Sequence, residues 1–112
     1  LLGAAGLKDI GYYFPPEDDA YKGISSMILL KHVNSLLKER GLEAYNIDIM
    51  VISETPKLKP HIDTMKANLQ SVLEIPLDRI SIKATTNEML GAIGRREGIA
   101  AQAVVSVYEG EV

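Results

Sequence analysis

Residues 45–53 read YNIDIMVIS, an alternation of side chains that predicts a β-strand. The residues of one face of this strand are apolar: Ile47, Ile49 and Val51. Two residues of the other face are apolar as well, Met50 and Ile52. We therefore expect both faces of the strand to be covered. The strand should end at Thr55-Pro56-Lys57, because proline interrupts the ladder of hydrogen bonds.

The segments on either side of this strand have their own periodicity. Before it, a helix is expected from Ser25 or Ser26 to Gly41, with a serine cap, apolar residues at helical spacing and a glycine stop. After it, a second helix begins near Pro60, and strands are expected at residues 79–84 and 99–108. A short turn or helix covers residues 87–95, and residues 9–23 form a loop. This order predicts an α+β fold, an α/β sandwich with one sheet covered by helices.

The overall composition excludes several classes of protein, of site and of partner. A chain of 112 residues predicts a single domain, residues 1–112, and 46% apolar residues are enough for a globular core. The absence of cysteine excludes disulfides, thiol catalysis and cysteine-ligated zinc. A net charge of −3 argues against nucleic acid as a partner, and no apolar run is long enough to span a membrane.

The first residues lack a helix start signal. Residues 1–7 are mostly apolar and no helix-capping residue precedes them. This is typical of the last part of a helix that begins further upstream. We therefore expect residues upstream of Leu1 in the complete protein. A frayed natural terminus is the alternative.

Residues 83–88, KATTNE, carry the most chemical information. A strand ends there and a helical turn begins, so the hydroxyls of Thr85 and Thr86 and nearby backbone N–H groups suit phosphate oxygens. The carboxylate of Glu88 could hold a hard cation. A capping box, in which Thr85 caps a helix and Glu88 reaches back, is the commoner use of this spacing, and the spacing alone favours it.

Other candidate positions are less specific. Thr55-Pro56-Lys57 could grip a phosphate or be a plain turn, and Asp9-Ile10-Gly11 could face a ligand or end the first helix. Residues 94–98, GRREG, could bind an anion, but an internally paired charge run is commoner. His32 and His61 lack the paired spacing of metal ligands, so we interpret both as structural or surface residues.

Five short motifs follow one another in a specific order. They are Asp9-Ile10-Gly11, Phe14-Pro15 with Asp18, Pro56-Lys57, Lys83-Ala84-Thr85-Thr86 with Glu88, and Gly94-Arg95 with Glu97-Gly98-Ile99-Ala100. Together they resemble the 2-C-methyl-D-erythritol 2,4-cyclodiphosphate synthase family over essentially all 112 residues. That family of lyases converts 4-diphosphocytidyl-2-C-methyl-D-erythritol 2-phosphate to the cyclic diphosphate and CMP in non-mevalonate isoprenoid biosynthesis. The resemblance implies one mixed sheet and a cytoplasmic enzyme, or one of the plastid stroma in a eukaryote.

The resemblance also implies a role for individual residues. Asp9 and Gly11 would contact the methylerythritol, and Phe14, Pro15 and Asp18 would lie on a loop that closes over it. The cytidine pocket would be walled by Pro56 and Lys57, within Ser53 to Lys59, and by Ala84, Thr85 and Thr86. The catalytic donor to the phosphates would be Thr86. Glu88 would ligate magnesium or manganese, and Arg95 would face a phosphate or a central anion.

Further cofactors and partners follow from the same resemblance. Zinc would be held by an Asp-x-His pair and a later histidine upstream of Leu1, so residues 1–112 would be the carboxy-terminal two thirds of a synthase domain, inactive alone. The family is a homotrimer with shared active sites, and an isoprenoid diphosphate could sit on its three-fold axis. A non-catalytic module that binds a nucleotide or an isoprenoid diphosphate is the alternative.

The sequence departs from the family's usual pattern in three places. Ser53-Glu54-Thr55 replaces a common Ala-Gln-Ala type of run, and Asn87 replaces the third threonine of a Thr-Thr-Thr-Glu motif. Ala92 stands where an aromatic residue is usual.

Overall fold

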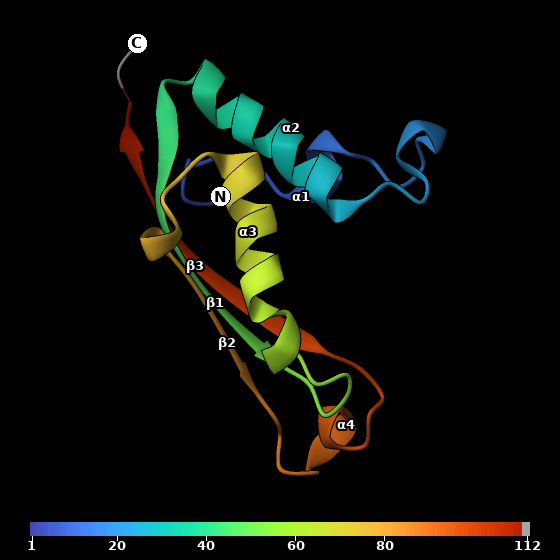
Figure 1. Cartoon of the computed structure of the whole chain (residues 1–112). Coiled ribbons are helices and arrows are strands. Elements are labelled where there is room, and N and C mark those ends of the chain that lie inside the picture. Colours follow the sequence, from blue (N-terminus) through green and yellow to red (C-terminus); the bar gives the residue numbers. More distant parts are fainter. Residues whose placement is uncertain (111–112) are drawn as a thin grey trace.

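A mixed three-stranded sheet is the frame of the computed structural model, which describes residues 1–110 (Figure 1). Its strands are β1 (Leu42–Ile52), β2 (Ile80–Thr85) and β3 (Ala100–Glu109). The helices are α1 (Ile10–Tyr13), α2 (Ser26–Glu39), α3 (Ile62–Leu73) and α4 (Gly91–Gly94). Short 3-10 turns cover Asp19–Tyr21, Lys59–His61 and Leu77–Arg79. The predicted α+β class and order of elements are thus confirmed.

The sheet is ordered β2-β1-β3, so β1 is the central strand. It runs parallel to β2, with Ile47 opposite Ile80, and α3 forms the crossover between them. It runs antiparallel to β3, from Leu42 opposite Glu109 to Ile52 opposite Ala100. Two parallel strands that end side by side bring the loops after them to one edge of the sheet.

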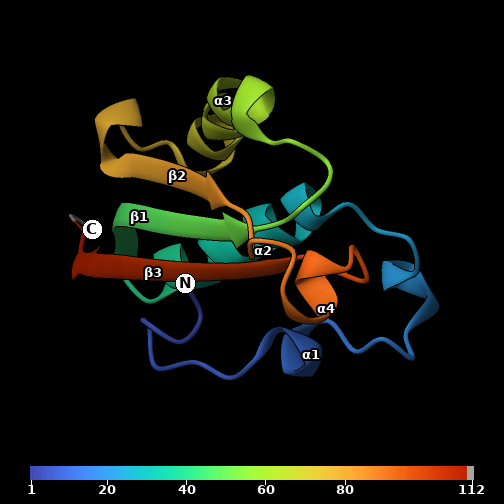
Figure 2. The ribbon, with the colours of Figure 1, turned by 90° about the horizontal axis from the view of Figure 1, so that it is seen from below.

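Helices α2 and α3 lie on the same face of the sheet (Figures 1 and 2). The core beneath them consists of buried apolar residues from β1, β2, the end of α3 and the segment that follows it: Ala44, Ile47, Leu73, Ile75, Ile80 and Ile82. A second buried cluster joins α2 to the amino-terminal segment through Phe14, Val33 and Leu37. The buried amide of Asn34 on α2 donates to the carbonyl of Val72 on α3 at 3.3 Å, which fixes the two helices relative to each other.

The opposite face of the sheet is not covered by a helix of residues 1–110, so within these residues helices cover only one face of β1. Met50 and Ile52 on the opposite face are partly buried. Polar side chains explain the difference between the two faces. Asp48 pairs with Lys83 at 2.8 Å, and Ser106 bonds to Asn46. These pairs cross from β1 to its neighbours and keep this face partly polar, although Val104 on the same sheet is 73% exposed.

The helix ends agree with the residue types found there. Ser25 caps α2 by accepting the N–H of Met27 at 3.2 Å, and Gly41 adopts a left-handed φ of 71° directly before β1. The strand therefore begins three residues earlier than the alternation of residues 45–53 predicted. At the start of the chain, Leu7 N–H donates to Leu2 O and Gly6 N–H to Gly3 O, the hydrogen-bond pattern of a last helical turn.

One loop prediction needs correction, because residues 9–23 contain α1 and a 3-10 turn. The short turn or helix predicted over residues 87–95 is confirmed: a turn at residues 88–89 is followed by α4. As for membranes, the longest helix of the described chain has 14 residues, and none is long and apolar enough to cross a bilayer.

Candidate active site

The loops that follow β1 and β2 enclose a pocket of about 160 Å³. The backbone N–H of Ser53 donates to the carbonyl of Thr85 at 3.0 Å, so the two strand ends are held together at the base of the pocket. Its lining residues come from both loops: Ser53, Pro56, Lys57, Leu58, Lys59, Ala84, Thr85 and Thr86. Both predicted walls of the nucleotide pocket are therefore brought together, although they lie far apart in the sequence.

The first wall is shaped by a buried serine and a proline. Ser53 is buried, and its hydroxyl donates to the carbonyl of Thr55 at 2.8 Å. The Thr55–Pro56 peptide is cis, and the exposed Lys57 and Lys59 follow it. Two ammonium groups beside a small pocket favour an anionic ligand such as a phosphate.

The second wall ends in a turn that presents a hydroxyl. Thr86 Oγ1 accepts the backbone N–H of Glu88 at 3.3 Å, which leaves the hydroxyl proton of Thr86 available to a ligand. The hydroxyl of Thr85 donates to the carbonyl of Thr86 at 3.3 Å. The geometry therefore suits donation to a phosphate oxygen from Thr86.

The capping box favoured by the spacing of Thr85 and Glu88 is wrong. Helix α4 begins only at Gly91, after Leu90 as its N-cap residue. Glu88 lies before the helix with a left-handed φ of 52°, and Met89 follows with 62°. The carboxylate that reaches these amides belongs to Glu54, whose Oε1 accepts the N–H of Asn87 at 2.8 Å and of Met89 at 3.2 Å.

Sequence reasoning placed Glu54 in the pocket wall but missed this contact between the loops. The available signal was the departure from the family's pattern at residues 53–55. Motif spacing along the sequence could not reveal the contact of Glu54 with Asn87 and Met89, because these residues are 33 and 35 positions from Glu54.

Helix α4 packs closely on the same turn. A Cβ added to Gly94 would lie 2.2 Å from the carbonyl carbon of Met89, so no larger residue fits there. Arg95 follows and pairs with Glu97 at 3.1 Å, with both side chains exposed. The predicted internally paired charge run is thus present, and the pair leaves Arg95 at the surface.

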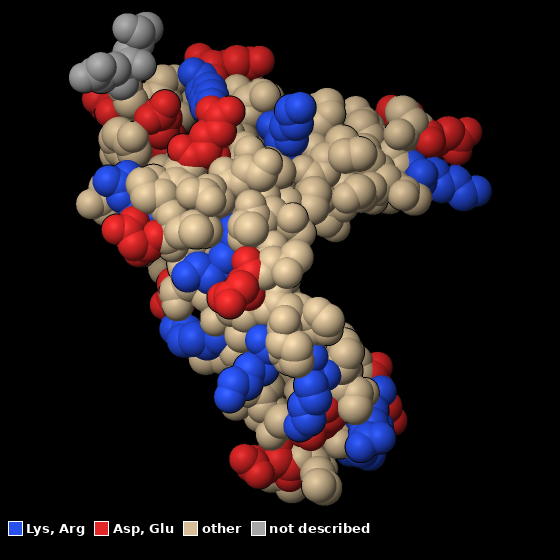
Figure 3. Space-filling view, viewed as in Figure 1, with Lys and Arg blue, Asp and Glu red and all other residues tan. Residues whose placement is uncertain are grey.

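The predicted methylerythritol-binding residues lie elsewhere in the chain. Asp9 caps α1 by accepting the N–H of Tyr12 at 3.0 Å, and Asp18 accepts the N–H of Ala20 at 3.0 Å. Phe14 is only 9% exposed and packs edge-on against Tyr21. Neither these residues nor Gly11 and Pro15 line the pocket. In Figure 3 a concave opening separates the arm that contains them from the arm with the strand ends, where Lys and Arg side chains gather.

The described residues do not provide a zinc site. Within residues 1–110, no group of three or more His, Asp or Glu side chains could hold a metal ion. His32 packs edge-on against Phe14, and His61 is exposed in a 3-10 turn, in agreement with the structural interpretation of both. Magnesium or manganese fits better, because such ions often use one protein carboxylate together with substrate phosphates, and Glu88 is exposed.

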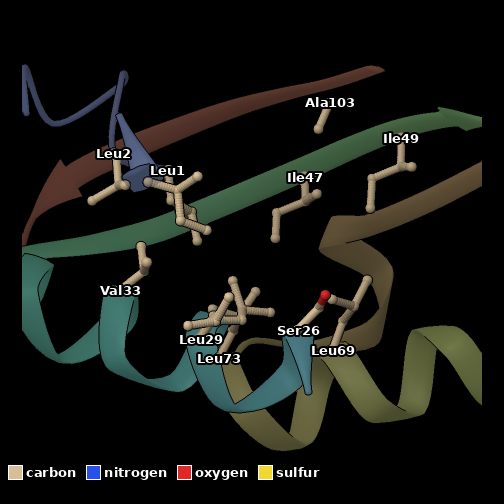
Figure 4. A pocket seen from close by; sticks show the side chains of 12 residues that line it. Leu1, Leu2, Ser26, Leu29, Val33, Ile47, Ile49, Leu69, Leu73 and Ala103 are labelled. Atoms are coloured by element: carbon tan, nitrogen blue, oxygen red, sulfur yellow. The ribbon is translucent and has the colours of Figure 1, made fainter. Parts of the chain in front are cut away.

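A larger pocket of about 350 Å³ lies between the sheet, α2 and α3 (Figure 4). Its lining is aliphatic apart from Ser26, and includes Leu1, Leu29, Ile47 and Leu69. None of its twelve lining residues has a titratable side chain, so no side chain of this pocket offers a charge to a phosphate or an acid or base for proton transfer.

Comparison with known proteins gives a consistent picture. Residues 1–108 match the YgbB family. A 2-C-methyl-D-erythritol 2,4-cyclodiphosphate synthase of Thermosynechococcus vestitus is 54% identical over 98% of this chain and 68% of its own length. The corresponding synthase of Nostoc punctiforme is 52% identical over 94% of this chain and 66% of its own length. The chain therefore spans about two thirds of the length of these curated relatives.

Solved structures agree with the fold. The bifunctional IspDF of Campylobacter jejuni superposes with a TM-score of 0.90 at 45% identity, over 95% of this chain and 29% of that one. A CDP complex of IspF from Plasmodium falciparum superposes with a TM-score of 0.84 at 32% identity, over 98% of this chain and 65% of that one.

Proposed function

The chain belongs to the YgbB family, and on this basis we propose that it forms the nucleotide-binding part of a 2-C-methyl-D-erythritol 2,4-cyclodiphosphate synthase. The observation that carries the proposal is the pocket where Pro56 and Lys57 meet Ala84, Thr85 and Thr86. CDP complexes of similar structures support a cytidine nucleotide as its occupant. The substrate would be 4-diphosphocytidyl-2-C-methyl-D-erythritol 2-phosphate.

The reaction is an intramolecular phosphoryl transfer. An oxygen of the 2-phosphate attacks the β-phosphorus, a new P–O bond closes the ring, and the bond to the bridging oxygen breaks to release CMP. Such a transfer depends mainly on positioning and on the neutralisation of charge. We assign the pocket walls to hold the cytidine, Lys57 to attract the phosphates, and the Thr86 hydroxyl to donate to the oxygens that gain charge. Magnesium or manganese held by Glu88 would neutralise charge on the diphosphate.

The active site would be shared between subunits of a homotrimer. Two observations support this part of the proposal. The residues expected at the methylerythritol, Asp9, Gly11, Phe14, Pro15 and Asp18, do not line the pocket of their own chain. In addition, one face of the sheet has no helix over it and exposes Val104, so it offers apolar area for contact between subunits.

Arg95 would face the three-fold axis of that trimer. Three guanidinium groups near one axis repel, and they stay charged at any accessible pH. The Glu97 carboxylate, already 3.1 Å from Arg95, would compensate part of this charge. The remainder favours an anion on the axis, and we propose an isoprenoid diphosphate.

Product analysis tests the proposed reaction. The complete encoded protein, given the substrate and magnesium, should release CMP and form the cyclic diphosphate in equal amounts, measured by phosphorus NMR. The alternative function, a non-catalytic binding module, predicts that CDP binds while no CMP is released. Binding without turnover would therefore replace the synthase assignment with the binding module.

A further inference from the structure

We infer that Glu54 is a positioning residue that fixes Thr86 and Glu88 for the reaction. This inference rests on the proposed function, because it assigns how two residues of that site are held. Glu54 is the first residue after Ser53 at the end of β1 and is half-buried beside the second loop. It reaches that loop with one oxygen and accepts two backbone N–H groups there.

The two amides that Glu54 binds stand on either side of Glu88. Asn87 N–H lies 2.8 Å from Glu54 Oε1, and Met89 N–H lies 3.2 Å from the same oxygen. The amide between them, that of Glu88, donates to Thr86 Oγ1 at 3.3 Å. Three consecutive amides are thus held by the side chains of Glu54 and Thr86, so the backbone that carries the Glu88 side chain is restrained on both sides.

The turn needs such support from outside. Glu88 and Met89 have φ values of 52° and 62°, a left-handed conformation that is unfavourable for residues other than glycine. Conformations of this kind persist where the surrounding structure imposes them. A carboxylate that accepts two N–H groups is a strong restraint, because charge-assisted hydrogen bonds are about twice as strong as neutral ones. Gly94 adds a second restraint by its close approach to Met89.

The contact also joins the two walls of the pocket. Glu54 belongs to the loop that carries Pro56 and Lys57, whereas Asn87 and Met89 belong to the loop that carries Thr86. Loss of the contact should therefore free the turn that carries Glu88 and weaken the binding of the cation that we assign to this carboxylate. Residues that orient a metal ligand typically change metal affinity by about 10–100-fold when mutated.

Binding of Mn²⁺ in the presence of CDP tests this without turnover. Paramagnetic resonance of the complete encoded protein would compare the wild type with three changes at Glu54. Glu54→Ala removes the acceptor and should weaken Mn²⁺ binding about tenfold. Glu54→Asp keeps the charge but is too short to reach both amides, so it should weaken binding similarly. Glu54→Gln keeps an acceptor of the same reach and should stay within about threefold of the wild type.

A matched control and a double variant separate a specific role from a structural one. Glu43→Ala removes a half-buried carboxylate of β1 that accepts a hydrogen bond from Tyr108, and it should leave Mn²⁺ binding unchanged. In a Glu88→Gln background, Glu54→Ala should cause no further loss, because both changes act through the same ligand. If Glu54→Ala does not fold, the Mn²⁺ affinity of Glu54→Asp relative to the wild type still decides the test.

Two results would overturn the inference. One is unchanged Mn²⁺ binding in both the Ala and the Asp variants. The other is an equal loss from Glu54→Ala with and without Glu88, which would place its effect elsewhere. A wild type that binds Mn²⁺ as expected but releases no CMP would instead refute the proposed reaction and leave the role of Glu54 standing.

Discussion

The amide of Ser53 donates to the carbonyl of Thr85 across 3.0 Å, at the point where β1 and β2 have just ended. This bond extends the parallel ladder by one step beyond the pair Ile52 and Thr85. The two loops that leave from it form opposite walls of one pocket. The paired ends of β1 and β2 thus set the separation of Lys57 and Thr86.

Thr86→Val should lower kcat by about 10²-fold, because the variant keeps the shape but loses the donor aimed at the developing charge. The affinity for CMP should change much less, since ground-state contacts remain. Thr86→Ser retains the hydroxyl and should recover most of the rate. Steady-state kinetics and CMP titrations of the complete encoded protein measure both quantities. Equal rates for the valine variant and the wild type would remove Thr86 from the catalytic site.

Glu88→Gln should raise the magnesium concentration needed for half-maximal rate by about tenfold or more, since a neutral amide is a weaker ligand for a hard cation. At saturating magnesium much of the rate should return. The control is Glu39→Gln, an exposed position on α2 outside the pocket, which should behave as the wild type. A magnesium titration that is identical for both variants would contradict the assignment of Glu88.

Phe14→Ala should lower the free energy of unfolding by about 3 kcal/mol, because the ring is buried between Tyr21, His32 and the apolar side of α2. Denaturant unfolding measures this change. Tyr12→Ala removes a neighbouring ring that is largely exposed, and it should cost much less. If the two losses were equal, Phe14 would not be part of the core.

Glu74→Gly should raise the free energy of unfolding by about 1 kcal/mol. Glu74 ends α3 with a left-handed φ of 58°, a conformation that glycine adopts without strain. The exposed ion pair with Lys38 would be lost, so the comparison belongs at about 1 M salt, where such pairs are screened. Glu39→Gly, in the last helical position of α2, should destabilise instead. Destabilisation by both changes would contradict this interpretation of Glu74.

Arg95→Ala should abolish the stabilisation of the assembly by an isoprenoid diphosphate. A ligand that touches all subunits raises the melting temperature by mass action, and the wild type should show this rise. CMP binding at Lys57 and Thr85 should persist in the variant. Light scattering gives the oligomeric state, and Arg40→Ala on the far end of α2 serves as the control. A monomer, or a melting temperature indifferent to the ligand, would refute the axial site.

The regular elements could be predicted because their signals are local. Helix α2 shows its serine cap, its apolar stripe and its glycine stop, and all three occur as expected. The alternation in residues 45–53 likewise identified β1, although its first residues follow Gly41 directly and carry no such pattern. The polar pairs on the helix-free face of the sheet were missed because Asp48 and Asn46 find their partners on other strands.

Two segments of the candidate pocket could be predicted from the sequence, but not the geometry that joins them. Lys57 and Thr86 were assigned to one pocket, and both line it. The spacing of Thr85 and Glu88 pointed to a capping box, since sequence distance reveals only local hydrogen bonds. The turn is instead hydrogen-bonded to Glu54 of the other loop, a contact that a local pattern cannot report. Phe14 appeared among loop residues, yet its ring belongs to the core.

The pairing of β1 with β3 has a consequence for how the chain folds. Strand β2 can pair with one edge of β1 soon after α3 has been synthesised. The other edge stays unpaired until β3 has been synthesised, because Leu42 lies opposite Glu109. Contacts between such distant residues make folding slow, because a long loop must close before they form. Until then Ile47, Ile49 and Val51 stand next to an open strand edge, the kind of surface on which nascent chains aggregate. The order of the elements thus leaves one edge of the central strand unpaired until the end of β3 has been synthesised.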